Sequence, residues 1–89
     1  DLDHFRRINA ELGHLAGDRA LAHAVQVLQR DLGRDEAMIR AGGEEFVLLL
    51  PLPLGAAWER MEALRRRLEA QPFEPSDGSE PRGLTLSAG

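Results

Sequence analysis

The chain has no cysteine, few aromatic residues and no long apolar run. The absence of cysteine excludes a disulfide framework and a thiolate metal site, and it fits a reducing compartment. The longest apolar run, Phe46 to Leu50, is far shorter than the roughly 20 residues that cross a bilayer. A net charge of -4 argues against a DNA- or RNA-binding surface, because such domains are usually basic. A small phosphorylated ligand is compatible with this charge, since it needs only a local cation or a bound metal.

What is present indicates one small globular domain. The 89 residues are 43% hydrophobic and 29% charged, which is typical of a chain that folds around a core. Both ends look internal to a longer domain, because the first residue is Asp1 and the last residues, Leu84 to Gly89, begin a strand-like alternation.

The first half of the chain predicts two helices. The first covers Asp1 to Leu12 and ends at Gly13, and its apolar stripe is Phe5, Ile8 and Leu12. Residues 14–17 are predicted as a loop, and Asp18 as the N-cap of a second helix that Gly33 ends. The apolar stripe of that second helix is Leu21, Val25, Leu28 and Leu32.

The second half predicts a hairpin, a helix and a last strand. The hairpin pairs residues 37–39 with residues 45–50 around a turn at 41–44. A third helix over about residues 56–70 is predicted to bury Trp58, Met61, Leu64 and Leu68. Residues 71–83 read as a loop. An apolar strand such as 46–50 needs cover on both faces, so the pattern predicts an α/β or α+β arrangement of helices on a sheet.

Two groups of polar residues near the start have both a structural and a functional interpretation. Asp1 and Asp3 could cap the first helix and favour its dipole, or serve a functional site, although D-x-D pairs are common. Asn9 and Asp18 flank one loop and could be solvated and capping residues. They could instead read a guanine edge, since an Asp carboxylate accepts from N1–H and N2–H₂ while an Asn amide both donates and accepts.

The run Gly42-Gly43-Glu44-Glu45 is harder to explain by structure alone. The glycines suit a tight hairpin, but paired glutamates repel one another and are disfavoured beside a strand. A carboxylate fixed on such a turn can hold Mg²⁺ against a phosphate, because Mg²⁺ takes one or two carboxylates and completes its shell with phosphate oxygens and water. The arginines Arg6, Arg7 and Arg40 are ordinary surface residues individually, although Arg6 could meet a phosphate held near Asp1.

Together these residues resemble the GGDEF family of diguanylate cyclases, in the variant whose signature is GGEEF (residues 42–46). Family domains open with D-x-D-x-F-K-x-I-N-D-x-x-G-H-x-x-G-D, matched by DLDHFRRINAELGHLAGD at residues 1–18. Arg6 keeps the charge of the family's lysine, whereas Ala10 replaces an acid. The family's R-[Y/F/L] before the glycines corresponds to Arg40-Ala41, and its T-x-S-x-G strand to Thr85, Ser87 and Gly89.

The resemblance implies a mixed, largely antiparallel sheet flanked by helices, which is the ferredoxin-like, palm-type fold of nucleotidyl cyclases. Residues 1–89 would be a partial domain that lacks the family's first strand and C-terminal helix, and that is inactive alone. The implied metal ligands for Mg²⁺ (or Mn²⁺) are Asp1, the Leu2 carbonyl and Glu44. Glu44 would also activate the attacking hydroxyl. The implied substrate-binding residues are Arg6, Asn9, His14, Asp18, Gly42 and Gly43.

The implied reaction joins two GTP molecules into cyclic di-GMP and releases two pyrophosphates, in bacterial signalling. It needs two domains face to face as an antiparallel homodimer, with sensor or receiver domains in the full protein. We expect a cytoplasmic location, with a tether to a membrane protein allowed, and no contact of this domain with nucleic acid or membrane. Many relatives carry an inhibitory R-x-x-D site, which here falls on Gly33 and Glu36, so we expect weak or absent product inhibition.

Two alternatives to an active cyclase stay open. The first is a catalytically inactive, GTP-binding regulatory GGDEF module that controls a neighbouring domain. The second is a purely structural α/β interaction module, for which every match to the family motifs would be a coincidence.

Overall fold

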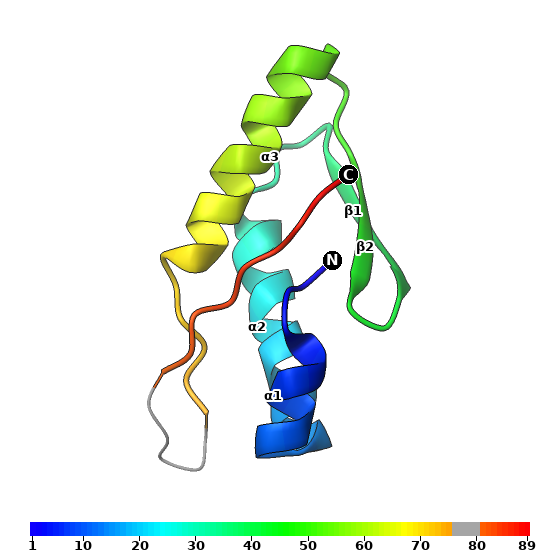
Figure 1. Ribbon diagram of the computed structural model, residues 1–89. Helices are drawn as coiled ribbons and strands as arrows, with labels where there is room; N and C mark the ends of the chain where they lie inside the picture. The colour runs from blue at the N-terminus through cyan, green and yellow to red at the C-terminus, as the bar shows by residue number, and fades with distance from the viewer. Residues whose placement is uncertain (76–80) are drawn as a thin grey trace.

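The computed structural model describes residues 1–75 and 81–89 and arranges three helices beside one β-hairpin (Figure 1). The chain segments at the two termini run between the helices and the hairpin. Residues 76–80 of the predicted loop lie outside the described residues. No helix in the described part of the chain has the length and apolar character needed to cross a membrane. The elements, in chain order, are α1 (Phe5–Leu12), α2 (His14–Asp31), β1 (Ala37–Gly42), β2 (Glu45–Leu49) and α3 (Leu54–Glu69).

The first helix begins later than predicted. α1 starts at Phe5, because Leu2 forms a β-bridge with Leu86 and His4 adopts a left-handed φ of 59° just before the helix. The prediction of helix over residues 1–4 is therefore wrong, and no acid lies in the first turn of α1. Its apolar stripe is confirmed, since Ile8 is buried and its two neighbours in the stripe pack against the core.

The second helix begins earlier than predicted. α2 starts at His14 directly after Gly13, whose φ of 89° ends α1, so the predicted loop at residues 14–17 is wrong. Asp18 lies inside α2 and is not its N-cap. The buried face also differs from the predicted stripe, since Val25 and Leu32 are only partly buried, and small residues let the neighbouring helices approach closely. That face comprises Gly17, Ala20, Leu21, Ala24, Val27 and Leu28.

The hairpin is confirmed, with longer first and shorter second strands than predicted. β1 and β2 are antiparallel, with Ile39 opposite Val47, and the register shifts between Arg40 and Gly42. Met38, Phe46 and Leu48 face the core and are half-buried. On the other face, three apolar side chains are about half exposed, so the described residues cover only one face of this sheet. Those side chains are Ile39 at 53%, Val47 at 47% and Leu49 at 52%.

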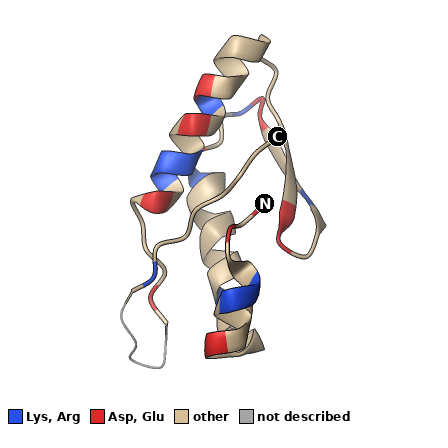
Figure 2. Cartoon of the chain, in the orientation of Figure 1, with Lys and Arg blue, Asp and Glu red and all other residues tan. Residues whose placement is uncertain are grey.

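The third helix buries only its C-terminal half. Leu64 and Leu68 are fully buried and Met61 packs against the core. Trp58, predicted to be buried, is 66% exposed, because the first turns of α3 extend past the end of α2 in Figure 1. Acidic and basic residues alternate along α3 (Figure 2). Among them, Arg65 bridges Glu62 and Glu69 at 3.0 and 2.6 Å.

Two isolated antiparallel bridges hold the C-terminal segment. Phe73 exchanges backbone hydrogen bonds with Arg82 at 2.7 Å, inside the segment predicted as a loop. Leu86 pairs with Leu2, so the predicted strand at 84–89 is present only as this bridge. Leu84 and Leu86 are buried, and the segment therefore completes the core beside α2 and α3.

Candidate functional site

The segment Asp1–Leu2 lies against the tip of the hairpin. The Leu2 amide donates to the Glu44 carbonyl at 3.1 Å, while the bridge to Leu86 holds the other edge of this segment. Leu2 is only 6% exposed, so burial of its side chain fixes the backbone at this point. The fold thus brings together two of the segments that the sequence singled out, although more than 40 residues separate Asp1 from Glu44 along the chain.

These two segments supply oxygen donors suited to a hard divalent cation. Within the described residues, no donor is bonded to the carboxylates of Asp1 and Glu44 or to the Leu2 carbonyl. Mg²⁺ prefers such oxygens and usually takes only one or two carboxylates, with phosphate and water as further ligands. The described part of the chain has no cluster of three or more His, Cys, Asp or Glu that could form an all-protein metal cage. The donor set fits Mg²⁺ held jointly with a phosphorylated ligand.

The turn that carries Glu44 is shaped by glycine and fixed by an arginine. Gly43 has a φ of 52°, a left-handed conformation that strains other residues. The Nε of Arg40 donates to the Gly43 carbonyl at 3.0 Å. The sequence drew attention to Arg40 without assigning it this role. A positive side chain three residues before a Gly-Glu turn was the available signal.

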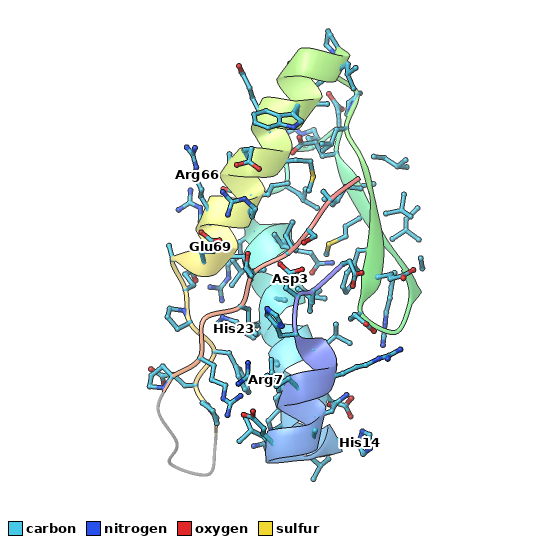
Figure 3. All side chains as sticks on the ribbon, in the orientation of Figure 1. Asp3, Arg7, His14, His23, Arg66 and Glu69 are labelled. Atoms are coloured by element: carbon cyan, nitrogen blue, oxygen red, sulfur yellow. The ribbon has the colours of Figure 1, made fainter. Side chains whose placement is uncertain are left out.

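A second contact, between Asp3 and Ser87, was not foreseen. The Ser87 hydroxyl donates to Asp3 Oδ1 at 2.7 Å, and the Ser87 amide donates to the Asp1 carbonyl at 2.9 Å. Figure 3 shows Asp3 where the N-terminal segment passes the C-terminal segment. Asp3 is therefore linked through Ser87 to the Asp1 backbone, and it is not a helix cap.

Asn9 packs onto Gly17 where α1 crosses α2. A Cβ atom at position 17 would lie 1.6 Å from Asn9 Oδ1, so the carboxamide occupies the space that the glycine leaves. Asp18 follows directly and is exposed. No described residue bonds to the Asp18 carboxylate or to the Asn9 carboxamide, and both can meet a ligand. Sequence reasoning missed the role of Gly17, a buried glycine inside a helix.

The predicted site residues fall at two ends of α1. His14 lies at the end of α1 that is remote from Asp3, and its side chain points away from the protein in Figure 3. An eight-residue helix is about 12 Å long, so the structure does not bring His14 to the place where Asp1 and Leu2 meet the hairpin tip at Glu44. Arg6 is exposed in the first turn of α1.

Glu36, at the position of the missing inhibitory site, is already paired. Its carboxylate accepts from Arg60 at 2.7 Å and from the Gly33 amide at 2.7 Å. The hydrogen bonds from Arg60 lower the pKa of Glu36 to about 2, with the Gly33 amide adding to the effect. The carboxylate therefore stays charged at neutral pH and has its partners within the chain.

A cavity of about 500 Å³ lies between the hairpin and the C-terminal segment. Asp1 and Glu45 line it together with apolar side chains, among them Phe46, Leu48 and Leu86. Glu45, and not Glu44, thus shares this cavity with Asp1, while Glu44 meets Leu2 through its backbone.

Comparison with known proteins identifies the family. The family model described as "Diguanylate cyclase, GGDEF domain" matches residues 1–89. The diguanylate cyclase DgcP of Pseudomonas aeruginosa is 44% identical over all of this chain and 13% of its own length. The response regulator PleD of Caulobacter vibrioides is 33% identical over all of this chain and 20% of its own.

Solved structures similar to this chain belong to the same family. Diguanylate cyclase SiaD of Pseudomonas aeruginosa, solved with its activator SiaC, matches 96% of this chain and 32% of its own, at 32% identity and a TM-score of 0.86. The GGDEF domain of YfiN from the same organism matches 94% of this chain and 52% of its own, at 36% identity and a TM-score of 0.80. The chain belongs to the GGDEF family, and the predicted mixed α/β class is confirmed. It spans a small part of the curated relatives that it matches.

Proposed function

We propose that this chain is part of a diguanylate cyclase domain that condenses two GTP molecules into cyclic di-GMP and two pyrophosphates. The observation that carries the proposal is the hydrogen bond between the Leu2 amide and the Glu44 carbonyl, which brings Asp1 and the hairpin tip together. Family membership and the names of the relatives support it.

The chemistry is an in-line displacement at phosphorus. The 3′-hydroxyl of one GTP attacks the α-phosphorus of the other, the new P–O bond forms, and the bond to pyrophosphate breaks. Mg²⁺ (or Mn²⁺), when bound by Asp1, the Leu2 carbonyl and Glu44, supplies charge stabilisation to the entering and leaving oxygens. Glu44 accepts the proton of the attacking hydroxyl. A turn fixed by Gly43 and Arg40 keeps this carboxylate in place before substrate arrives.

The substrate is held from both ends of α1. Asn9 and Asp18 read the guanine edge, and the lack of a competing partner among the described residues for either side chain supports this role. Arg6, in the first turn of α1, contacts a phosphate. His14, the first residue of α2, would contact a nucleotide that extends past the end of α1.

Catalysis requires a second copy of the domain. Each copy holds one GTP, and the two α-phosphates become neighbours only when two sites face each other in an antiparallel homodimer. Residues 1–89 are one part of a longer domain in this proposal, since the chain spans 52% of the solved YfiN GGDEF domain. Sensor or receiver domains in the same protein would control the pairing.

Product analysis with the full-length protein tests this function. The protein is incubated with GTP and Mg²⁺, and the nucleotides are resolved by chromatography, with ATP as the matched control substrate. Cyclic di-GMP from GTP and no cyclic dinucleotide from ATP is the expected result. Binding of GTP without any product, even after enforced dimerisation, would reject the cyclase and favour a GTP-binding regulatory module.

A further inference from the structure

A cluster of charged side chains joins the end of α2, the start of β1 and the body of α3. The Nε of Arg60 donates to Glu36 Oε2 at 2.8 Å, and its Nη2 donates to Glu36 Oε1 at 2.7 Å. Its Nη1 donates to Asp31 Oδ2 at 3.1 Å, and the guanidinium also donates to the Asp31 carbonyl. The Gly33 amide completes the shell of the Glu36 carboxylate.

This cluster is more enclosed than the other ion pairs of the described residues. The Arg60 and Glu36 side chains are 23% and 11% exposed, whereas exposed pairs such as Arg7–Glu11 reach 71% and 40%. Exposed ion pairs contribute little to stability. Enclosed, bidentate Arg–carboxylate pairs are directional, and removal of one partner destabilises the protein because it leaves an uncompensated charge. Removal of Arg60 would leave Glu36 charged and without its main partner.

The position of the pair in the chain gives it a role in the hairpin. Glu36 directly precedes β1, and Arg60 lies on α3, which follows β2. Their contact therefore closes residues 37–59 into one loop that contains the turn at Gly43–Glu44. The hairpin is held at its base by this pair and at its tip by the bond from Leu2 to Glu44.

Little else fixes the orientation of the hairpin in the described part of the chain. Only its inner face packs on the core, through Met38, Phe46 and Leu48, and all three are half-buried. The outer face is exposed at Ile39 and Val47. A change at the base is thus transmitted to the tip, because the paired strands between them move as one unit.

We propose that Arg60 is a positioning residue that, through Glu36, fixes the base of the β1–β2 hairpin and so keeps Glu44 beside the Asp1–Leu2 segment. The effect on catalysis rests on the proposed function. The effect on the hairpin does not, so the two can fail separately.

The test compares three variants of the full-length protein. Arg60→Met keeps the approximate length of the side chain and removes its hydrogen bonds. Arg60→Lys keeps the positive charge but cannot form the bidentate hydrogen bond. Arg67→Met is the matched control, since Arg67 also lies on α3 and donates to Asp31, at 3.2 Å, but makes no hydrogen bond or ion pair with Glu36. Amide hydrogen exchange is measured across residues 37–46, together with kcat and KM for GTP.

We expect Arg60→Met to raise hairpin exchange about tenfold and lower kcat about tenfold, with KM within about twofold of wild type. Arg60→Lys should recover part of both, and Arg67→Met should resemble wild type. Equal exchange in the Arg60→Met and Arg67→Met proteins would overturn the proposal. If Arg60→Met does not fold, Glu36→Gln gives the same exchange comparison. A wild-type protein that makes no cyclic di-GMP rejects the proposed function, and the exchange comparison then decides the positioning role alone.

Discussion

The carboxamide of Asn9 fills the space above Gly17, where a Cβ atom would lie 1.6 Å from Asn9 Oδ1. A buried glycine inside a helix is otherwise a cost of roughly 1 kcal/mol relative to alanine. The contact indicates that position 17 is kept small so that Asn9 can lie against α2, beside Asp18.

Gly17→Ala should therefore lower the affinity for GTP clearly, while it changes the free energy of unfolding only a little. The methyl group forces Asn9 into another rotamer, which a flexible side chain can adopt at a cost of about 1 kcal/mol, but the base-reading amide is then misplaced. We expect GTP affinity to fall about tenfold by calorimetry, as for loss of one hydrogen-bonding group. Gly55→Ala is the control, because no described residue outside its own helical turn and chain neighbours lies within 4 Å of a Cβ at Gly55. Equal affinities for the two variants would contradict the role of Asn9.

Substitution of Glu44 and of Glu45 should have different effects on the reaction rate. Glu44→Gln is expected to reduce the rate of cyclic di-GMP formation by at least about 100-fold while leaving the melting temperature within a few degrees, since the group is polar and solvent-accessible. Glu45→Gln tests the neighbour that lines the cavity with Asp1. A Glu44→Gln protein with an unchanged rate would show that its assigned role is wrong.

Product inhibition through the turn at residues 33–36 should be weak or absent. Gly33 has no side chain to meet a phosphate, and the Glu36 carboxylate is held by Arg60 and the Gly33 amide. Calorimetry with cyclic di-GMP should detect no micromolar site that Glu36→Gln removes. Micromolar or tighter binding that maps to residues 33–36 would refute this expectation.

Acid should weaken the ion pair between Arg60 and Glu36. The pKa of Glu36 is lowered from 4.5 to about 2 by Arg60, so its stabilising contribution is complete above the unfolded-state pKa of 4.5. The contribution is lost as the pH falls through the folded-state pKa. Urea unfolding of wild type and Glu36→Gln should differ by about 1–3 kcal/mol near pH 6. The difference should shrink as the pH approaches 2. A difference independent of pH would contradict the pairing.

The sequence allowed good prediction of what depends on local pattern. The stripe of Phe5, Ile8 and Leu12 and the Gly-rich turn were recognisable because side-chain periodicity and glycine conformation are properties of neighbouring residues. The family motif predicts that Asp1 and Glu44 share one site; the structure joins their segments by the Leu2–Glu44 backbone hydrogen bond, and the roles of the two side chains stay a prediction.

One error was local, and the others came where distant residues decide the outcome. Asp18 resembles an N-cap locally, but α2 begins at His14 because Gly13 alone turns the chain. The helical pattern at Asp1–His4 is overridden by the pairing of Leu2 with Leu86, a contact across almost the whole chain. Trp58 continues the apolar stripe of α3, yet the part of the core that is described ends before it. Neither propensity nor periodicity carries such long-range information.

The most direct test of the central claim is the stoichiometry of the reaction. Full-length protein, dimerised by a fused coiled coil, is incubated with GTP and Mg²⁺, and pyrophosphate and cyclic di-GMP are quantified together. The proposed chemistry predicts two pyrophosphates for each cyclic di-GMP, and loss of both products in the Glu44→Gln protein. Tight GTP binding with neither product would contradict it.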